Sequence, residues 1–146
     1  MYFFYIDLID FMILEEFPSY FFNIFDLFLA KTKELYVVIW KDEVKLFNHL
    51  SNFGHISKVD SYTLTFLVDK REDFLNDLYA NNSVEDFDQL IKYFQITLIL
   101  DSGENLEFAH NGREIYLSSI SGDEYLKLKS MLEPYKDYLS IDCGRM

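Results

Sequence analysis

Three histidines are the side chains of this sequence best suited to acid–base catalysis or metal binding, because imidazole titrates closest to neutral pH. His49 and His55 flank a predicted helix end, and His110 lies beside a predicted turn. Two imidazoles reach one metal from a helix when they are roughly four residues apart, and this pair is spaced more widely. The only cysteine, Cys143, is far away in the sequence. The spacing therefore predicts no metal site and no histidine catalyst.

The other catalytic arrangements are also missing from the sequence. Ser102-Gly103 and Ser121-Gly122 lack the glycine-flanked elbow that exposes a nucleophilic serine. With five glycines and no phosphate-binding loop motif, a nucleotide cofactor is not expected. Glu43-Val44-Lys45 matches half of a nuclease metal motif, but it lies at a predicted helix start rather than on a strand. We therefore expect no catalytic residues, no metal and no cofactor, and predict that the chain is not an enzyme.

Carboxylates are abundant, and most pairs lie at predicted helix starts, where they stabilise the helix dipole. Twenty-five acidic residues against 13 basic ones give a formal net charge of −12. Such a charge repels phosphate backbones and attracts cationic proteins. The composition therefore disfavours direct nucleic-acid binding and favours a basic protein partner. The alternative, a charge that only keeps an apolar-rich chain soluble, stays open at this stage.

One acidic region goes beyond ordinary solvation. Residues 69–107 contain ten acidic residues against Lys70, Arg71 and Lys92. Within two predicted helices, acidic side chains recur at the three- or four-residue spacing that places like charges on one face, at a cost of about a few tenths of a kcal/mol each. A surface kept for a basic partner would tolerate this repulsion, and so would a solvated helix face. The predicted partner-binding residues are Asp73, Asp77, Glu85, Asp88, Asp101 and Glu104.

The elements that position these residues predict a single α+β domain over residues 1–146. Twenty-two of the first 30 residues are apolar. Its pattern predicts helices over 7–16 and 19–30, and residues 2–6 are expected to form a strand or the start of a helix. Acidic residues interrupt it and no basic residue precedes Lys31, so neither a secretory signal nor a membrane span is expected. The segment is either part of the core or a seam for a homodimer.

A second part, over residues 35–143, is predicted to be the α+β core with a mostly antiparallel sheet. Strands are expected at 35–40, 56–59, 62–68 and 96–100, and helices at 42–53, 71–80 and 84–94. Residues 35–101 could therefore trace a ferredoxin-like βαββαβ unit. A type I′ turn at Asn111-Gly112 places Phe108 opposite Ile115. Ser121 and Glu124 form a capping box for a helix that ends before Pro134, and a last strand is expected at 139–143.

In size, acidity, aromatic content and lack of a catalytic motif, the chain resembles the bacterial immunity proteins of contact-dependent and polymorphic toxin systems. The resemblance implies a cytoplasmic, stoichiometric inhibitor that occludes the active site of a cationic, nuclease-type toxin. A single cysteine fits the reducing cytoplasm. Two alternatives stay open: a phage-encoded inhibitor of a nucleic-acid-targeting defence enzyme, and a non-catalytic dimeric scaffold protein.

Overall fold

Apolar and polar residues alternate along the extended segments of this chain, and this alternation produces one sheet with two different faces. The computed structural model describes residues 1–9, 18–81 and 90–146. Their strands are β1 (Tyr2–Leu8), β2 (Thr32–Trp40), β3 (Gly54–Val59), β4 (Thr63–Val68), β5 (Gln95–Leu100), β6 (Asn105–Ala109), β7 (Glu114–Ile120) and β8 (Leu139–Arg145). Their helices are α1 (Pro18–Leu29), α2 (Val44–Leu50), α3 (Arg71–Ala80) and α4 (Gly122–Leu132), with a 3₁₀ turn at Glu133–Tyr135.

The strands form a single antiparallel sheet in the order β3-β4-β2-β5-β6-β7-β1-β8. Because β2 and β3 both pair antiparallel with β4, they run parallel to each other and α2 connects them across the sheet. The segment from β2 to β5 thus has the element order and the split pairing expected for a ferredoxin-like unit. The α+β prediction, with a mostly antiparallel sheet, is confirmed.

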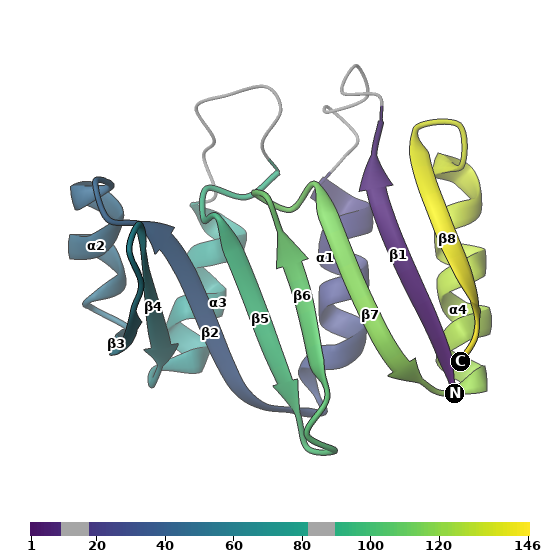
Figure 1. The fold of residues 1–146 in the computed structure, drawn as a ribbon, viewed down its shortest axis with the longest axis horizontal. Coiled ribbons are helices and arrows are strands. Elements are labelled where there is room, and N and C mark those ends of the chain that lie inside the picture. The colour runs from purple at the N-terminus through teal and green to yellow at the C-terminus, as the bar shows by residue number, and fades with distance from the viewer. Residues whose placement is uncertain (10–17, 82–89) are drawn as a thin grey trace.

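The helices pack against one face of the sheet, as Figure 1 shows for α1, α3 and α4 behind the strands. Phe21 and Phe25 of α1 contact Phe108 of β6 edge to face, at 5.2 and 5.3 Å between ring centroids. Phe47, in α2, contacts Phe66 of β4 on the same side. Each fully buried aromatic removes roughly 150–250 Å² from water. This aromatic layer between helices and sheet is the core.

The N-terminal prediction needs correction. Residues 2–8 form β1, an inner strand between β7 and β8, so the helix predicted over 7–16 is wrong at residues 7–9. Residues 10–16 of that predicted helix lie outside the described residues. The apolar side chains of Phe4, Ile6 and Leu8 point into the core. A strand that is buried on one face and half-buried on the other has a nearly continuous run of apolar residues. A buried helix can have the same sequence pattern, so the pattern alone did not distinguish the two.

The apolar helix expected at 19–30 is α1. Its side chains at Tyr20, Phe21, Ile24, Phe25 and Phe28 are buried. The interpretation as a core helix is therefore confirmed for this segment. A homodimer through residues 1–30 stays a prediction. Within the described residues, no helix is long and apolar enough to cross a membrane.

Two local predictions are confirmed and one is wrong. Asn111 and Gly112 have φ of 58° and 84°, as a type I′ turn requires, and Phe108 pairs with Ile115. Ser121 and Glu124 form the capping box of α4. The helix expected over 84–94 is wrong at 90–94, where the chain bends toward β5 without helical bonding; 84–89 lie outside the described residues.

Candidate functional site

The face of the sheet away from the helices, here called the open face, carries the side chains that alternate with the core residues. The central and C-terminal strands, β5, β6, β7, β1 and β8, contain no lysine or arginine except Arg145, at the end of β8. Their four acidic residues all occupy open-face positions. These carboxylates belong to Asp7, Glu107, Glu114 and Asp142. The open face is therefore acidic by strand register.

The strand pairing brings these residues together with two tyrosines. Across four neighbouring strands, Glu107 pairs with Tyr116, Tyr116 with Tyr5, and Tyr5 with Asp142. One step along the strands, Asp7 pairs with Glu114. Directly opposed residues in antiparallel strands have Cβ atoms about 4.5–5.5 Å apart, so these side chains form one continuous surface. We call it the acidic–tyrosine patch: Tyr5, Asp7, Glu107, Glu114, Tyr116 and Asp142.

Tyr116 lies at the centre of the patch and links its aromatic and acidic parts. Its ring contacts that of Tyr5 at 4.6 Å between centroids, and its hydroxyl donates a hydrogen bond to Glu114 Oε2 at 2.5 Å. This hydrogen bond to a carboxylate is the main reason that the pKa of Tyr116 is raised above its usual value. Tyr116 therefore stays neutral near physiological pH and presents a rigid ring beside ionised carboxylates.

Glu114 is the best-supported carboxylate of the patch. Burial alone would raise its pKa, but hydrogen bonds from Tyr116 and His110 and the charges of His110 and Arg113 outweigh burial and lower the pKa. His110 Nδ1 lies 3.0 Å from Glu114 Oε2, and Arg113 Nη2 lies 3.6 Å from Oε1. The β6–β7 turn supplies both partners. Glu114 is consequently ionised and fixed in position.

Asp7, the cross-strand neighbour of Glu114, is in the opposite situation. Its Oδ1 is buried and accepts no hydrogen bond from the described residues, and its nearest cation is Arg113 Nε at 4.0 Å. Burial and repulsion by Glu114 raise the pKa of Asp7, despite the opposing charges of Arg113 and His110. Two like charges held opposite each other cost stability. The fold tolerates this cost on the open face.

Glu107 and Asp142 flank the tyrosines on either side. Neither carboxylate forms an ion pair or a hydrogen bond with any part of the chain that the structure describes. Arg113 is shared between Asp7 and Glu114, and His110 also contacts Glu114. The patch therefore keeps negative charge that the described chain does not neutralise.

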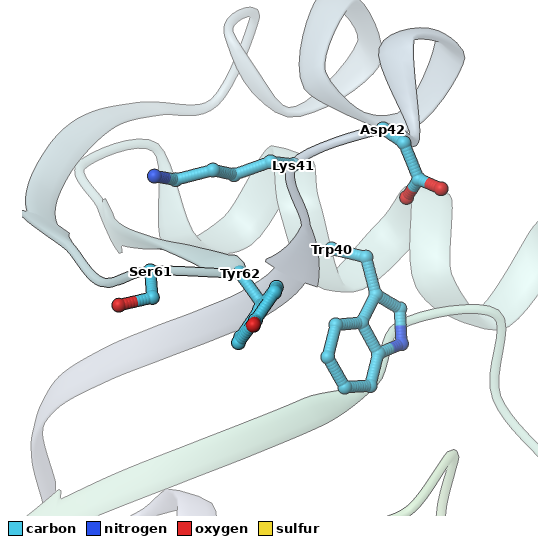
Figure 2. A pocket seen from close by; sticks show the side chains of 5 residues that line it. All are labelled: Trp40, Lys41, Asp42, Ser61 and Tyr62. Carbon is cyan, nitrogen blue, oxygen red and sulfur yellow. The ribbon is translucent and has the colours of Figure 1, made fainter.

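An aromatic extension continues the open face beyond the patch. The ring of Phe94 contacts His110 at 5.5 Å and Trp40 at 4.5 Å. Trp40 follows Tyr36 and Val38 in the alternating open-face series of β2, and its side chain is 41% exposed. Figure 2 shows the rings of Trp40 and Tyr62 directed to the same side, where they line a shallow hollow together with Lys41, Asp42 and Ser61. Exposed aromatic rings are typical of protein-binding surfaces.

The residues predicted from the sequence lie elsewhere. Asp73 and Asp77 are on α3, on the covered side of the sheet, and Asp101 and Glu104 are in the β5–β6 turn. Asp77 is engaged within the chain: its Oδ2 lies 2.6 Å from His49 Nε2 and 4.0 Å from Lys92 Nζ. Burial opposes ionisation, but these partners and Asn81 lower the pKa of Asp77. Glu85 and Asp88 lie outside the described residues.

The predicted binding residues thus do not coincide with the patch, and the signal that sequence reasoning missed is strand parity. The four patch carboxylates come from three separate parts of the sequence, around residues 7, 107–114 and 142, but each one alternates with core residues inside a strand. As for the histidines, each of the three lies within 3.0 Å of one carboxylate. Within the described ranges no group of three or more metal-binding side chains occurs.

Comparison of the chain with protein-family models, with curated proteins and with solved structures finds no match.

Proposed function

We propose that this chain is a non-catalytic, stoichiometric inhibitor that binds a cationic protein through the open face of its sheet. The observation that carries the proposal is the acidic–tyrosine patch, whose carboxylates at Glu107 and Asp142 have no partner in the described chain. Uncompensated carboxylates complement the basic groove of an enzyme that acts on nucleic acids, and they accelerate association by electrostatic steering.

The rings at the centre of the patch add affinity to this charge complementarity. Tyr5 and Tyr116 are rigid and half-exposed, and interface hot spots are enriched in tyrosine and tryptophan. An arginine or lysine of the partner could contact a tyrosine face and a carboxylate together. A nuclease-type toxin inhibited in the cytoplasm is the partner class that fits best, because its active-site groove is cationic.

The test compares two charge reversals, one on the open face of the sheet and one on the side that the helices cover. Glu107→Lys changes the patch, and Asp73→Lys makes the same change on α3. Each variant and the unchanged chain serve as bait for proteins of the native host, and every captured protein is then purified. We expect a basic protein that the Asp73→Lys bait retains and the Glu107→Lys bait loses, and whose activity falls to zero at equimolar inhibitor.

Kinetic measurements on that partner sharpen the test. The association rate should fall steeply between about 0.05 and 0.5 M salt, because the Debye length shortens from roughly 14 to 4 Å, and Glu107→Lys should flatten this dependence. A partner that binds the Glu107→Lys variant as fast as the unchanged chain would contradict the proposed surface. A partner lost only on Asp73→Lys would return the interface to the sequence-predicted residues of α3.

A further inference from the structure

The two edges of the sheet differ in their readiness to accept another strand. Pairing of β3 with β4 is interrupted by a register shift between Ile56 and Lys58, and the exposed Lys58 lies on this edge. Bulges and lysines are the devices that protect natural edge strands. At the other edge, β8 pairs with β1 at seven consecutive positions without a shift, and it contains neither proline nor lysine. The β8 edge is therefore the accessible one.

The hydrogen-bond phase of β8 shows which backbone groups face outward. The N–H of Met146 donates to the carbonyl of Met1, and the N–H of Ile9 donates to the carbonyl of Tyr138, both at 2.9 Å. Because antiparallel ladders alternate, every second residue of β8 bonds to β1 and those between point away from the sheet. The outward residues are Leu139, Ile141, Cys143 and Arg145. No described residue forms a hydrogen bond with their backbone groups.

A small hollow lies beside this edge on the helical side of the sheet. Phe4, Leu132, Ile141 and Cys143 supply its apolar lining, and three charged residues of α4 and the following turn complete it: Lys129, Glu133 and Lys136. Its volume is about 90 Å³, enough for a small aliphatic side chain. A strand added along β8 would direct every second side chain toward this hollow.

On the open face, Asp142 lies at the middle of β8, with Tyr5 as its cross-strand neighbour. A second copy of the chain, paired antiparallel with all outward residues matched, would place Asp142 directly opposite its own counterpart. Like charges in that position are destabilising, whereas an opposite charge stabilises a cross-strand pair. Charge complementarity thus favours a different chain with a basic residue at this position.

We propose that the β8 edge and the adjoining hollow bind an extended segment of a partner protein as an added strand of the sheet. The segment places an apolar side chain over the hollow and a lysine or arginine opposite Asp142. Backbone hydrogen bonds provide affinity in this mode, and the alternating side chains provide specificity. This inference goes beyond the proposed function, because the outward backbone groups of β8 and the hollow carry it; the two proposals share only Asp142.

The experiment uses a displayed library of random linear peptides of about seven residues, the length of β8, with the full chain as bait. Selected peptides are synthesised and amide exchange is measured by NMR. Binding should slow exchange at Ile141, Cys143 and Arg145 by at least about tenfold, because each bound amide becomes protected, and should change Asp142 little. Failure to select any peptide, or selected peptides that leave the outward amides unchanged, would overturn the proposal.

Three variants test which groups of the β8 edge determine peptide binding. Cys143→Pro removes an outward N–H and no bond to β1, as proline at an edge allows, and should weaken binding about tenfold. Asp142→Lys should select acidic instead of basic residues at the facing position, whereas Asp137→Lys, the same charge change in the loop before β8, should not. If Asp142→Lys selects the same basic peptides, or if the free chain is a dimer with protected outward amides, the proposed occupant is wrong.

Discussion

The two faces of the sheet are built from the same strands, yet they follow different rules. On the covered face, most strand residues are buried and apolar, as Phe4, Phe108 and Leu139 are. On the open face, apolar residues such as Val38 and Trp40 are mixed with tyrosines, threonines and carboxylates, including the opposed pair of Asp7 and Glu114. Burial of apolar area dominates stability, so it dictates the covered face and leaves the open face free to carry unfavourable charge. The covered face therefore serves stability, and the open face is the one that we propose for binding.

The strongest test of this difference between the faces is to truncate two adjacent strand residues whose side chains lie on opposite faces. Phe108 is fully buried against Phe21 and Phe25, and Phe108→Ala should lower the free energy of unfolding by about 3–5 kcal/mol. Glu107, the preceding residue, forms no ion pair or side-chain hydrogen bond with the described residues that truncation would lose. Glu107→Ala should change the unfolding free energy by less than about 0.5 kcal/mol. Urea denaturation of both variants measures the two values.

An equal loss in both variants would mean that the open face also contributes to the core. The m-value of each transition provides the control, because a changed slope would indicate a changed unfolded or native state rather than a lost contact.

The covered side also shows how much the sequence could predict. Local rules that act within a few residues were sufficient for the Asn111-Gly112 turn and for the Ser121–Glu124 capping box, because each uses side chains next to the backbone that they organise. The boundaries of α3 were predicted from the helical spacing of Phe74, Leu75 and Leu78 and from the polar break after Ala80, without a side-chain cap. Residues 2–8 were harder, since β1 is fixed by pairing with β7 and β8, which lie more than 100 positions later.

The proposed binding surface could not be predicted in the same way. Residues near one another in the sequence suggested an acidic region over 69–107, but the sheet instead assembles Asp7, Glu107, Glu114 and Asp142 from four separate strands. Only the strand order makes these positions neighbours. The alternation of each carboxylate with apolar residues was visible in the sequence, and this alternation assigns the carboxylate to the open face. The predicted Asn111-Gly112 turn also sets the pairing of β6 with β7, but the pairing of these strands with β1 and β8 was not visible.

Two carboxylates on opposite sides of the sheet sharpen the comparison further. Glu124 of α4 is 8% exposed, forms an ion pair with Lys31, and accepts a hydrogen bond from the backbone N–H of Ser121 at 3.0 Å. Burial opposes its ionisation, but these partners lower its pKa below the usual 4.5. Glu124→Gln keeps the cap and removes the charge, so it should destabilise the fold by about 1–2 kcal/mol at pH 7.

The pH dependence of this loss identifies its cause. A lowered folded pKa means that the ionised carboxylate stabilises the fold above the unfolded pKa of 4.5, and that this contribution is lost as the pH falls through the folded pKa. The stability difference between Glu124→Gln and the unchanged chain should therefore shrink below pH 4.5. A difference that stays constant at lower pH would assign the loss to packing instead of charge.

Asp7 provides the smallest expected effect, with the opposite sign. Its folded pKa is raised above the usual 3.8 by burial and by Glu114, so ionised Asp7 destabilises the native state at neutral pH, and this penalty disappears as the pH falls toward 3.8. Asp7→Asn should therefore raise the melting temperature slightly at pH 7 and not near pH 3.8. The same substitution removes one charge from the acidic–tyrosine patch, so it should also slow association with a cationic partner.

A variant that is more stable but binds more slowly is the result expected if Asp7 contributes to recognition at a cost in stability. If Asp7→Asn instead lowers the melting temperature at pH 7, the attraction of Arg113 outweighs the repulsion of Glu114, and the open face would have to be counted as electrostatically stabilising.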